Sequence, residues 1–280
     1  MSAASDIAVA IIPVAGRGTR LGPVTRAVPK AMLPLVGPDG SVRPVADLIA
    51  REALAAGIER ICFVTAPGQD GLLRSYFDGE ADLSGRIEYV TDVLPLGLGY
   101  AVWAARAAAG GAAAMVLLGD HVHLPGPSGT APAAEVADAF AAESPAAMIG
   151  VQVIAETQTS LVGICRGEPV GEDLYRCRQI VEKPGPEAAE SLATPGLPRG
   201  NYLAHAGIYV FGPEIFDCLE ALVAGCAEGD EVGLTEAEQA LLARRPDEVL
   251  LRPINGRTLD VGTPDGYRDA MAAMVGAPDA

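Results

Sequence analysis

The sequence predicts an α/β protein built on an open sheet. Two near-continuous apolar runs, over residues 7–14 and 113–118, are typical of strands that are buried on both faces. Segments with helical spacing alternate with the strands at short intervals, which favours strand–helix–strand units with right-handed crossovers. Half of the 280 residues are hydrophobic and only 5% are aromatic, so the chain can bury a sizeable aliphatic core.

The expected elements of the first half alternate regularly. The first strand, 7–14, runs into a loop rich in glycine and arginine. A helix is expected over 45–56, where Gly57 ends it. The other expected elements are a strand at 60–65, a short helix at 69–77, a strand at 87–90, a helix at 98–109 and the strand at 113–118.

The second half is more mixed. Residues 124–132 and 184–199 are rich in proline and glycine and are expected to form loops. Segments 161–165 and 174–181 are expected to pair as a hairpin. The remaining expected elements are helices at 133–142, 235–243 and 263–274 and strands at 147–153, 205–211, 249–252 and 257–261. No repeat or low-complexity linker divides the chain, which favours one mixed domain over two separable ones.

Composition excludes several classes of protein. No apolar run reaches the eighteen or so residues that a membrane helix needs, and the start of the chain does not have the pattern of a secretory signal. The five cysteines are scattered and form no CxxC pair, which favours reduced thiols in the cytoplasm over disulfides or a zinc site. The net charge of −16 argues against binding to a nucleic-acid backbone.

The charge is distributed unevenly. Residues 7–38 contain no acidic side chain but hold Arg17, Arg20, Arg26 and Lys30. Glycines lie between these basic residues, so the stretch can receive an anion on side chains and backbone N–H groups together. A chance gap in the acidic residues is the alternative.

Lysine is rare in this chain. Eighteen of the twenty basic residues are arginines, and the two lysines are Lys30 and Lys183. A compact ammonium and a planar guanidinium do not substitute freely at a close phosphate contact. The two lysines therefore indicate two positions that need an ammonium, unless they are the remainder of a codon bias.

The loop that follows the first strand contains Gly16, Gly18 and Gly22. It is not a phosphate-binding loop of the GK[ST] type, and its third glycine is one residue too late for the dinucleotide-binding pattern. Because the loop follows the carboxyl end of a strand, we expect it to border the ligand crevice. Gly97 and Gly99 precede the helix at 98–109 and can act in the same way.

Several motifs occur in the order found in one enzyme family. Residues 14–35, VAGRGTRLGPVTRAVPKAMLPL, resemble the signature of the sugar-1-phosphate nucleotidylyltransferases and are most similar to that of bacterial UTP–glucose-1-phosphate uridylyltransferases. The likeness extends to about residue 269. Its further motifs are Gly97-Leu98-Gly99, Gly119-Asp120, Glu182-Lys183-Pro184, the segment 229–235 and Leu259-Asp260-Val261-Gly262-Thr263-Pro264.

The resemblance implies a fold and a division of the chain. The fold would be a Rossmann-like open mixed sheet in three α/β/α layers, of the nucleotide-diphospho-sugar transferase type. A single domain over 1–275 would have a nucleotide-binding half, 1–125, and a sugar-binding half, 126–275. Relatives are commonly dimers or tetramers, so a homo-oligomer is expected.

The implied reaction joins a nucleoside triphosphate to a sugar-1-phosphate, giving an NDP-sugar and pyrophosphate. The attacking phosphate is already an anion, so catalysis has to come from alignment and charge neutralisation. By resemblance, Asp120 and Asp260 would hold Mg²⁺, which suits a few carboxylates together with phosphate oxygens and waters. Arg20 would grip the leaving phosphates, Lys30 the nucleotide α-phosphate and Lys183 the acceptor phosphate.

The remaining site residues also follow from the resemblance. The nucleotide would be bound by Ala15, Gly16, Gly18, Thr19, Asp92, Gly97 and Gly99. The sugar would be bound by Gly163, Glu182 and Gly207.

Several of these positions have a simpler interpretation. Asp120 could cap its loop, Asp260 could pair with Arg257, and Glu182 with Lys183 could form a solvated turn. His121 and His123 point to one face beside Asp120, but imidazole does not suit Mg²⁺, so we expect them to be pocket-wall residues.

The sequence departs from the uridylyltransferases at two places. Ala31 stands where they usually have glutamate, and Thr91-Asp92 where they usually have Arg-Gln. A carboxylate only accepts hydrogen bonds, which suits the adjacent donors of guanine better than uracil. Either Asp92 reads the base, or it points to solvent and the backbone of Ala15 and Gly16 selects the base.

Three hypotheses follow from these observations. The first is a uridylyltransferase acting on glucose-1-phosphate. The second is a guanylyltransferase that uses GTP with another hexose or a cyclitol phosphate. The third is a nucleotide-sugar-binding homologue without catalysis, against which the presence of all five charged site residues argues.

Overall fold

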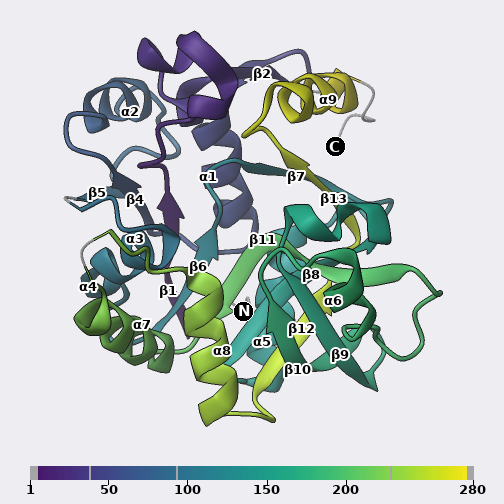
Figure 1. The fold of residues 1–280 in the computed structure, drawn as a ribbon. Coiled ribbons are helices and arrows are strands. Elements are labelled where there is room, and N and C mark those ends of the chain that lie inside the picture. The colour runs from purple at the N-terminus through teal and green to yellow at the C-terminus, as the bar shows by residue number, and fades with distance from the viewer. Residues whose placement is uncertain (1–5, 38, 93, 228, 276–280) are drawn as a thin grey trace.

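A computed structural model describes residues 6–37, 39–92, 94–227 and 229–275. Residues 1–5 and Pro38 lie outside these ranges. Residues 1–5 belong to the segment tested above for a secretory signal, and Pro38 ends the stretch without acidic side chains. The largest sheet has nine strands in the order β5-β4-β1-β6-β11-β8-β12-β10-β9 (Figure 1). The strands are β1 (Ile7–Pro13), β4 (Ile61–Thr65), β5 (Ile87–Thr91), β6 (Ala113–Leu117), β8 (Ala147–Ala155), β9 (Ile164–Gly171), β10 (Leu174–Val181), β11 (Asn201–Phe211) and β12 (Val249–Pro253).

The first half of the chain forms the parallel part of this sheet. Ala10 of β1 lies opposite Ile61 of β4 on one side and Met115 of β6 on the other. The chain runs outward from β1 to β4 and β5 and then returns to the opposite side of β1 as β6. The loops after β1 and β6 therefore leave the sheet at a topological switch point, where α/β sheets bind ligands.

The second half continues the sheet with mostly antiparallel strands. β11 pairs antiparallel with β6 and joins the two halves. β9 and β10 form a hairpin as expected, but β9 covers Ile164–Gly171 instead of the expected 161–165. β9 also turns back to pair with the start of β11, where Leu203 lies opposite Cys165, so the last strands close on one another. The mixed sheet predicted from the sequence is confirmed.

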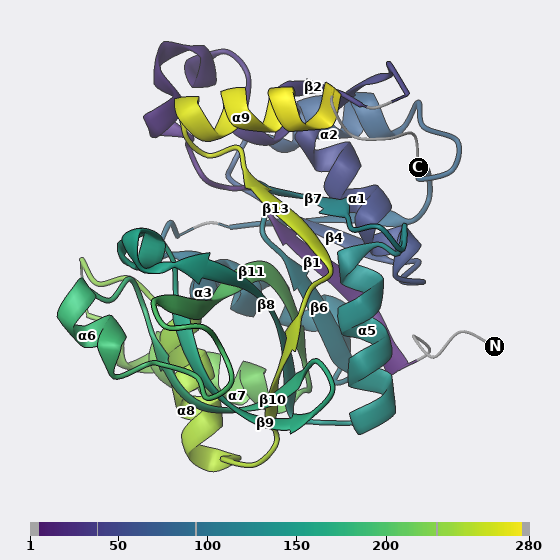
Figure 2. The same cartoon turned by 90° about the vertical axis from the view of Figure 1, so that its right-hand side faces the viewer.

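Helices cover both faces of the sheet. Alternate residues of each strand point to opposite faces, so Ile12 belongs to the core cluster that includes residues of α1, α2 and α5, whereas Ile11 belongs to the cluster on the other face, which includes residues of α3, α4, α7 and α8. Figure 2 shows α5 on one side of the strands and α7 and α8 on the other. These helices are α1 (Val45–Ala55), α2 (Asp70–Phe77), α3 (Leu98–Ala104), α4 (Arg106–Ala109), α5 (Pro132–Glu143), α7 (Glu214–Gly225) and α8 (Leu234–Arg244). The three-layer α/β/α architecture is therefore confirmed.

Short elements shape the edge from which the loops after β1 and β6 emerge. Two small antiparallel sheets pair β2 (Pro34–Val36) with β3 (Val42–Pro44) and β7 (His121–Pro125) with β13 (Gly256–Asp260). The loop after β1 contains 3-10 helices at Thr19–Arg26 and Lys30–Met32, and another lies at Glu156–Leu161. The remaining helices are α6 (Pro186–Glu190) and α9 (Pro264–Val275).

The structure differs from the expected elements in several places. The helix expected at 98–109 is two helices, because the backbone at Ala105 leaves the helical region with φ −87° and ψ 4°. The loop expected at 124–132 begins inside β7, and the loop expected at 184–199 contains α6. Helix α7 was not expected, although Ile215, Leu219 and Leu222 repeat at helical spacing along its inner face.

Candidate active site

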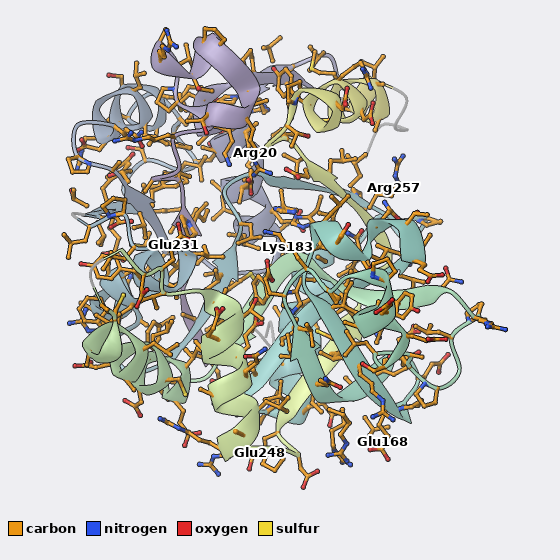
Figure 3. The ribbon with its side chains drawn as sticks, viewed as in Figure 1. Arg20, Glu168, Lys183, Glu231, Glu248 and Arg257 are labelled. Carbon is orange, nitrogen blue, oxygen red and sulfur yellow. The ribbon has the colours of Figure 1, made fainter. Side chains whose placement is uncertain are left out.

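A cavity of about 1290 Å³ opens where the loops after β1 and β6 leave the sheet. In Figure 3, Arg20, Lys183 and Glu231 lie around the centre of the molecule, on segments from both halves of the chain. Eleven of the predicted site residues line the cavity: Ala15, Gly16, Arg20, Lys30, Asp92, Gly97, Asp120, Gly163, Glu182, Lys183 and Asp260.

Gly18, Thr19, Gly99 and Gly207 are the predicted site residues that do not line the cavity. A Cβ atom at Gly18 would lie 3.0 Å from the Cβ of Lys30, and one at Gly207 would lie 3.0 Å from the ring of His121. Gly18 and Gly207 therefore lie behind Lys30 and His121, two side chains that do line the cavity. A larger residue at position 18 or 207 would displace the side chain in front of it. Gly99 instead lets helix α3 approach the backbone of Gly233, whose oxygen would lie 2.7 Å from an added Cβ.

Two aspartates from distant parts of the chain converge at one end of the cavity. The pairing of β7 with β13 sets Asp260 opposite His121, and the N–H of Val261 donates to the carbonyl of Asp120 at 2.8 Å. A Cβ atom added to Gly262 would lie 2.8 Å from Oδ1 of Asp260 and 2.9 Å from Oδ2 of Asp120. The two carboxylates thus face nearly the same point, although 140 positions separate them in the sequence.

Basic groups surround this pair of aspartates. Lys30 Nζ donates to Asp120 Oδ2 at 2.6 Å, and a guanidinium nitrogen of Arg20 would lie 3.4 Å from the same added Cβ. Burial alone would raise the pKa of Asp120, but His121 and Lys30 outweigh it through hydrogen bonds and charge, so this pKa falls well below its usual range. We refer to Arg20, Lys30, Asp120 and Asp260 as the aspartate end of the cavity.

Acidic and polar side chains line another part of the cavity. Glu182 Oε1 lies 3.3 Å from Lys183 Nζ, and Glu182 Oε2 accepts a hydrogen bond from the hydroxyl of Thr235 at 3.0 Å. Lys183 adopts a left-handed backbone with φ 45°, a conformation that is uncommon for a residue with a side chain. We refer to Glu182, Lys183, His205, Glu236 and Glu238 as the glutamate end.

Gly163 adjoins the glutamate end because it has no side chain. A Cβ atom there would lie 2.6 Å from Nδ1 of His205 and 3.0 Å from Oε2 of Glu182. The N–H of His205 donates to the carbonyl of Gly163 at 3.0 Å, which ties β11 to the start of β9. A larger residue at position 163 would displace both side chains.

His205 and Glu238 are cavity residues that the sequence analysis did not identify. His205 lies in β11 and Glu238 on the inner face of α8, four residues after Leu234 and three before Leu241. Both are buried. The signal in the sequence is a polar residue at a position that its periodicity assigns to the core.

Asp92 follows β5 and lines a third part of the cavity, beside Pro95 and Gly97. Only 6% of its surface is exposed, so the alternative that it points to solvent is wrong. Its carboxylate accepts a hydrogen bond from the N–H of Leu94 at 3.2 Å. Burial raises the pKa of Asp92, and that hydrogen bond only partly offsets the effect.

The two histidines beside Asp120 have different surroundings. His121 lines the cavity, and its Nδ1 lies 3.1 Å from Asp120 Oδ1. His123 is buried outside the cavity lining, where its Nε2 contacts the carbonyl oxygen of Ala206 at 2.8 Å, and burial lowers its pKa to about 4. His121 is therefore a wall residue as expected, whereas His123 is not.

Among the described residues, no group of three or more histidine, cysteine, aspartate or glutamate side chains is arranged to hold a metal ion. A metal at the aspartate end would have to be completed by ligand oxygens and water. None of the helices in the described ranges is long and apolar enough to cross a membrane.

Comparison with known proteins agrees with the motifs. The pattern of the nucleotidyl transferase family matches residues 9–275. A UTP–glucose-1-phosphate uridylyltransferase of Staphylococcus epidermidis is 33% identical over 92% of this chain and 88% of its own length. The corresponding enzyme of Pseudomonas aeruginosa is 30% identical over 93% of both chains.

Solved structures give the same result. A UTP-bound UGPase from Acinetobacter baumannii superimposes with a TM-score of 0.78 at 27% identity, covering 95% of this chain and 93% of that one. A UDP-glucose pyrophosphorylase complexed with UDP-glucose superimposes with the same score at 24% identity, which supports the nucleotide-diphospho-sugar transferase fold. The resemblance expected from the motifs is confirmed, and the chain belongs to the nucleotidyl transferase family.

Proposed function

We propose that this protein transfers a nucleoside monophosphate from a nucleoside triphosphate to a sugar-1-phosphate, with UTP and glucose-1-phosphate as the first candidates. One observation carries the proposal: Asp120, Asp260, Arg20 and Lys30 meet at one end of a cavity whose other end holds Lys183. The substrates named for the relatives support UTP and glucose-1-phosphate.

The reaction exchanges one bond at the α-phosphorus for another. An oxygen of the acceptor phosphate forms a bond to the α-phosphorus as the bond to the pyrophosphate oxygen breaks. Lys183 holds the acceptor phosphate, Lys30 faces the α-phosphate and Arg20 binds the leaving pyrophosphate. No side chain has to remove a proton, so the contribution of the protein is alignment and charge neutralisation.

The aspartate end suits Mg²⁺. Asp120 and Asp260 offer hard carboxylate oxygens that face nearly the same point, and Mg²⁺ is commonly held by one or two carboxylates together with substrate phosphates and waters. When bound there, Mg²⁺ would supply positive charge against the phosphate oxygens. The low pKa of Asp120 keeps its carboxylate ionised for this purpose.

The two substrates would occupy different parts of the cavity. We assign the nucleobase to the part lined by Ala15, Gly16, Asp92 and Gly97, and the sugar to Gly163 and the glutamate end. Gly18 and Gly207 would then act by making room for the side chains of Lys30 and His121. Gly99 would act by letting α3 approach the backbone of Gly233, and Thr19 through the loop to which it belongs. The triphosphate lies between these two parts, against the basic side chains of the aspartate end.

A second candidate reaction uses GTP. Asp92 lines the proposed base site and is buried, and an ionised carboxylate there accepts hydrogen bonds from the adjacent N1–H and N2–H₂ of guanine. Burial raises the pKa of Asp92, and a protonated acid would both donate and accept, as the edge of uracil requires. The acceptor in the GTP reaction would be another hexose-1-phosphate or a cyclitol phosphate.

The test is pyrophosphate release from UTP, dTTP, GTP, ATP and CTP, each with glucose-1-phosphate and then with a panel of hexose and cyclitol phosphates. We expect release with UTP and glucose-1-phosphate that depends on Mg²⁺ and stops when the metal is chelated. Preference for GTP would support the second candidate. Absence of release with every pair would instead support a binding protein without catalysis.

We propose a cytoplasmic location and a homo-oligomeric state as well. Both substrates are cytoplasmic metabolites, and the five cysteines, all free, suit a reducing compartment. The oligomeric state rests on the common behaviour of similar enzymes, and light scattering of the purified protein would test it.

A further inference from the structure

The glutamate end contains buried polar atoms that have no hydrogen-bond partner among the residues that the structure describes. Only 1% of Glu238 and 7% of His205 is exposed. Among the described residues, no group forms a hydrogen bond with either carboxyl oxygen of Glu238 or with Nε2 of His205. His205 Nε2 lies 3.4 Å from Glu238 Oε2, but the two atoms do not form a hydrogen bond.

Such atoms are unusual in a folded protein. Nearly all buried polar atoms have a hydrogen-bond partner, because removing them from water without one costs free energy of folding. Here three unpartnered atoms belong to two neighbouring side chains, and both side chains line the same cavity. A ligand in that cavity can supply the missing partners.

The surroundings favour a neutral ligand group that donates hydrogen bonds. Burial raises the pKa of Glu238 well above its usual range, and Cys177, Glu182 and Glu236 raise it further. Burial lowers the pKa of His205 to about 4, against the attraction of Glu182. A neutral acid and a neutral imidazole both retain free acceptor positions, which a hydroxyl or an amine can fill.

The position of the pair relates it to the acceptor. Gly163 and Glu182, which we assign to the sugar, lie against His205, since a Cβ atom at Gly163 would be 2.6 Å from its Nδ1. The ring of Tyr209 packs edge-on against His205, with centroids 5.4 Å apart, and closes the same wall of the cavity. The pair therefore faces the ring of the acceptor and not its phosphate, which we place at Lys183.

We propose that Glu238 and His205 are specificity-determining residues that accept hydrogen bonds from a hydroxyl or amino substituent on the ring of the acceptor phosphate. This inference rests on the proposed function. It adds a requirement at the acceptor site: one particular ring position has to carry a hydrogen-bond donor.

The first test separates a binding role from a structural one. Glu238→Leu removes both carboxyl oxygens and puts an apolar side chain of similar size in their place. We expect the unfolding temperature to stay the same or rise, because an unpartnered buried polar group is lost. The KM for the acceptor should rise about tenfold or more, with kcat and the KM for the nucleotide little changed. Glu238→Gln, which keeps one acceptor oxygen, should recover part of the loss.

The second test identifies the group that is recognised. Wild type and Glu238→Leu are assayed with glucose-1-phosphate and with analogues that carry fluorine or an amine in place of each hydroxyl in turn. At one ring position, fluorine in place of the hydroxyl should raise the KM of the wild type about tenfold and leave the KM of Glu238→Leu almost unchanged. An amine at the same position still donates a hydrogen bond, so it should preserve binding to the wild type. Glu220→Gln, an exposed charge change on α7, serves as the control and should behave as wild type.

Two outcomes would overturn the inference. A lower unfolding temperature for Glu238→Leu with an unchanged acceptor KM would assign the pair a structural role only. If each substitution on the acceptor raised the KM equally in wild type and in Glu238→Leu, Glu238 would recognise none of the substituted hydroxyl groups. If the wild type makes no nucleotide sugar from any acceptor, the proposed function itself fails. If instead the wild type and Glu238→Leu turn over every acceptor equally well, only the inference about Glu238 fails.

Discussion

The two ends of the cavity differ in how their charges are satisfied. At the aspartate end Lys30 and Asp120 are 2.6 Å apart, and Asp260 and Arg20 lie close to them, so opposite charges already balance. At the glutamate end three glutamates face one lysine, and the buried Glu238 lacks partners among the described residues. The charged groups of the aspartate end are therefore already paired before a substrate binds. The buried acceptor atoms of the glutamate end still need a hydrogen-bond donor, which a bound ligand can supply.

This difference indicates separate roles. A preorganised cluster of charges stabilises a transition state because little reorganisation is needed as the reaction proceeds. Unmet hydrogen-bonding groups instead discriminate between substrates, because a ligand that cannot satisfy them leaves them buried and unpaired. We therefore expect substitutions at the aspartate end to reduce the rate and substitutions at the glutamate end to alter acceptor choice.

The largest effect is expected from Asp120→Asn. This change keeps the shape of the side chain but removes its charge, so both the partner of Lys30 and the oxygen donor for Mg²⁺ are weakened. Turnover should fall about a thousandfold while the fold, followed by circular dichroism, is retained. Asp217→Asn, on the exposed side of α7, is the matched control. A normal rate with normal Mg²⁺ dependence in Asp120→Asn would remove Asp120 from the site.

Lys183→Arg tests the lysine of the glutamate end. The planar guanidinium cannot occupy the position of the ammonium, and misplacing a phosphate contact by about 1 Å can reduce the rate about a hundredfold. Arg199→Lys, an exposed exchange in the opposite direction, should have no measurable effect. An active Lys183→Arg enzyme would mean that only a positive charge is needed there.

Asp92→Gln tests the part of the cavity that we assign to the base. If Asp92 is ionised when nucleotide binds, glutamine should shift preference from GTP toward UTP or dTTP by roughly tenfold to a hundredfold. The measurement is the ratio of kcat/KM values for each nucleotide in both proteins. Identical ratios would show that Asp92 does not read the base.

Much of this site could be predicted from the sequence because short motifs carry it. The loop containing Arg20 and Lys30 and the segments around Asp120, Lys183 and Asp260 are short motifs that become recognisable because they occur together in the family's order. The fold class followed from apolar runs and helical spacing, which depend on local burial. The pairing of β11 with β6 was beyond such reasoning, because strands this far apart in sequence carry no local signal of their partner.

The parts that were missed share a physical cause. His205 and Glu238 look like isolated polar residues in apolar segments, and only the tertiary fold brings their side chains together. β7 is short and ends in a proline, so its pairing with β13 was not expected either. Gly207, which the resemblance assigns to the sugar, has a positive φ of 80°, and it lies against the ring of His121, outside the cavity lining.

A partly buried glutamate outside the cavity separates the effect of burial on a carboxyl group from the effect of missing hydrogen-bond partners. Glu52 accepts a hydrogen bond from the N–H of Ala133 at 2.7 Å, yet burial still raises its pKa to about 7. Between pH 4.5 and 7 the folded protein holds this proton more tightly than the unfolded chain, so stability falls as the pH rises through that range.

Glu52→Gln should abolish this part of the pH dependence, which amounts to about 3 kcal/mol of unfolding free energy. Activity should be unaffected, which makes this the smallest functional effect of the series. Denaturant unfolding at several pH values provides the measurement. Parallel stability profiles for wild type and Glu52→Gln would show that Glu52 titrates alike in the folded and unfolded states.

The most direct test of the account follows the α-phosphate itself. Wild-type protein, Mg²⁺ and glucose-1-phosphate are incubated with UTP labelled at the α-phosphorus, and in parallel with labelled GTP. We predict that the label appears in a nucleotide sugar, with one pyrophosphate released for each molecule formed, and that both products form about a thousandfold more slowly with Asp120→Asn. Label recovered as free nucleoside monophosphate, or left in both triphosphates, would contradict the account.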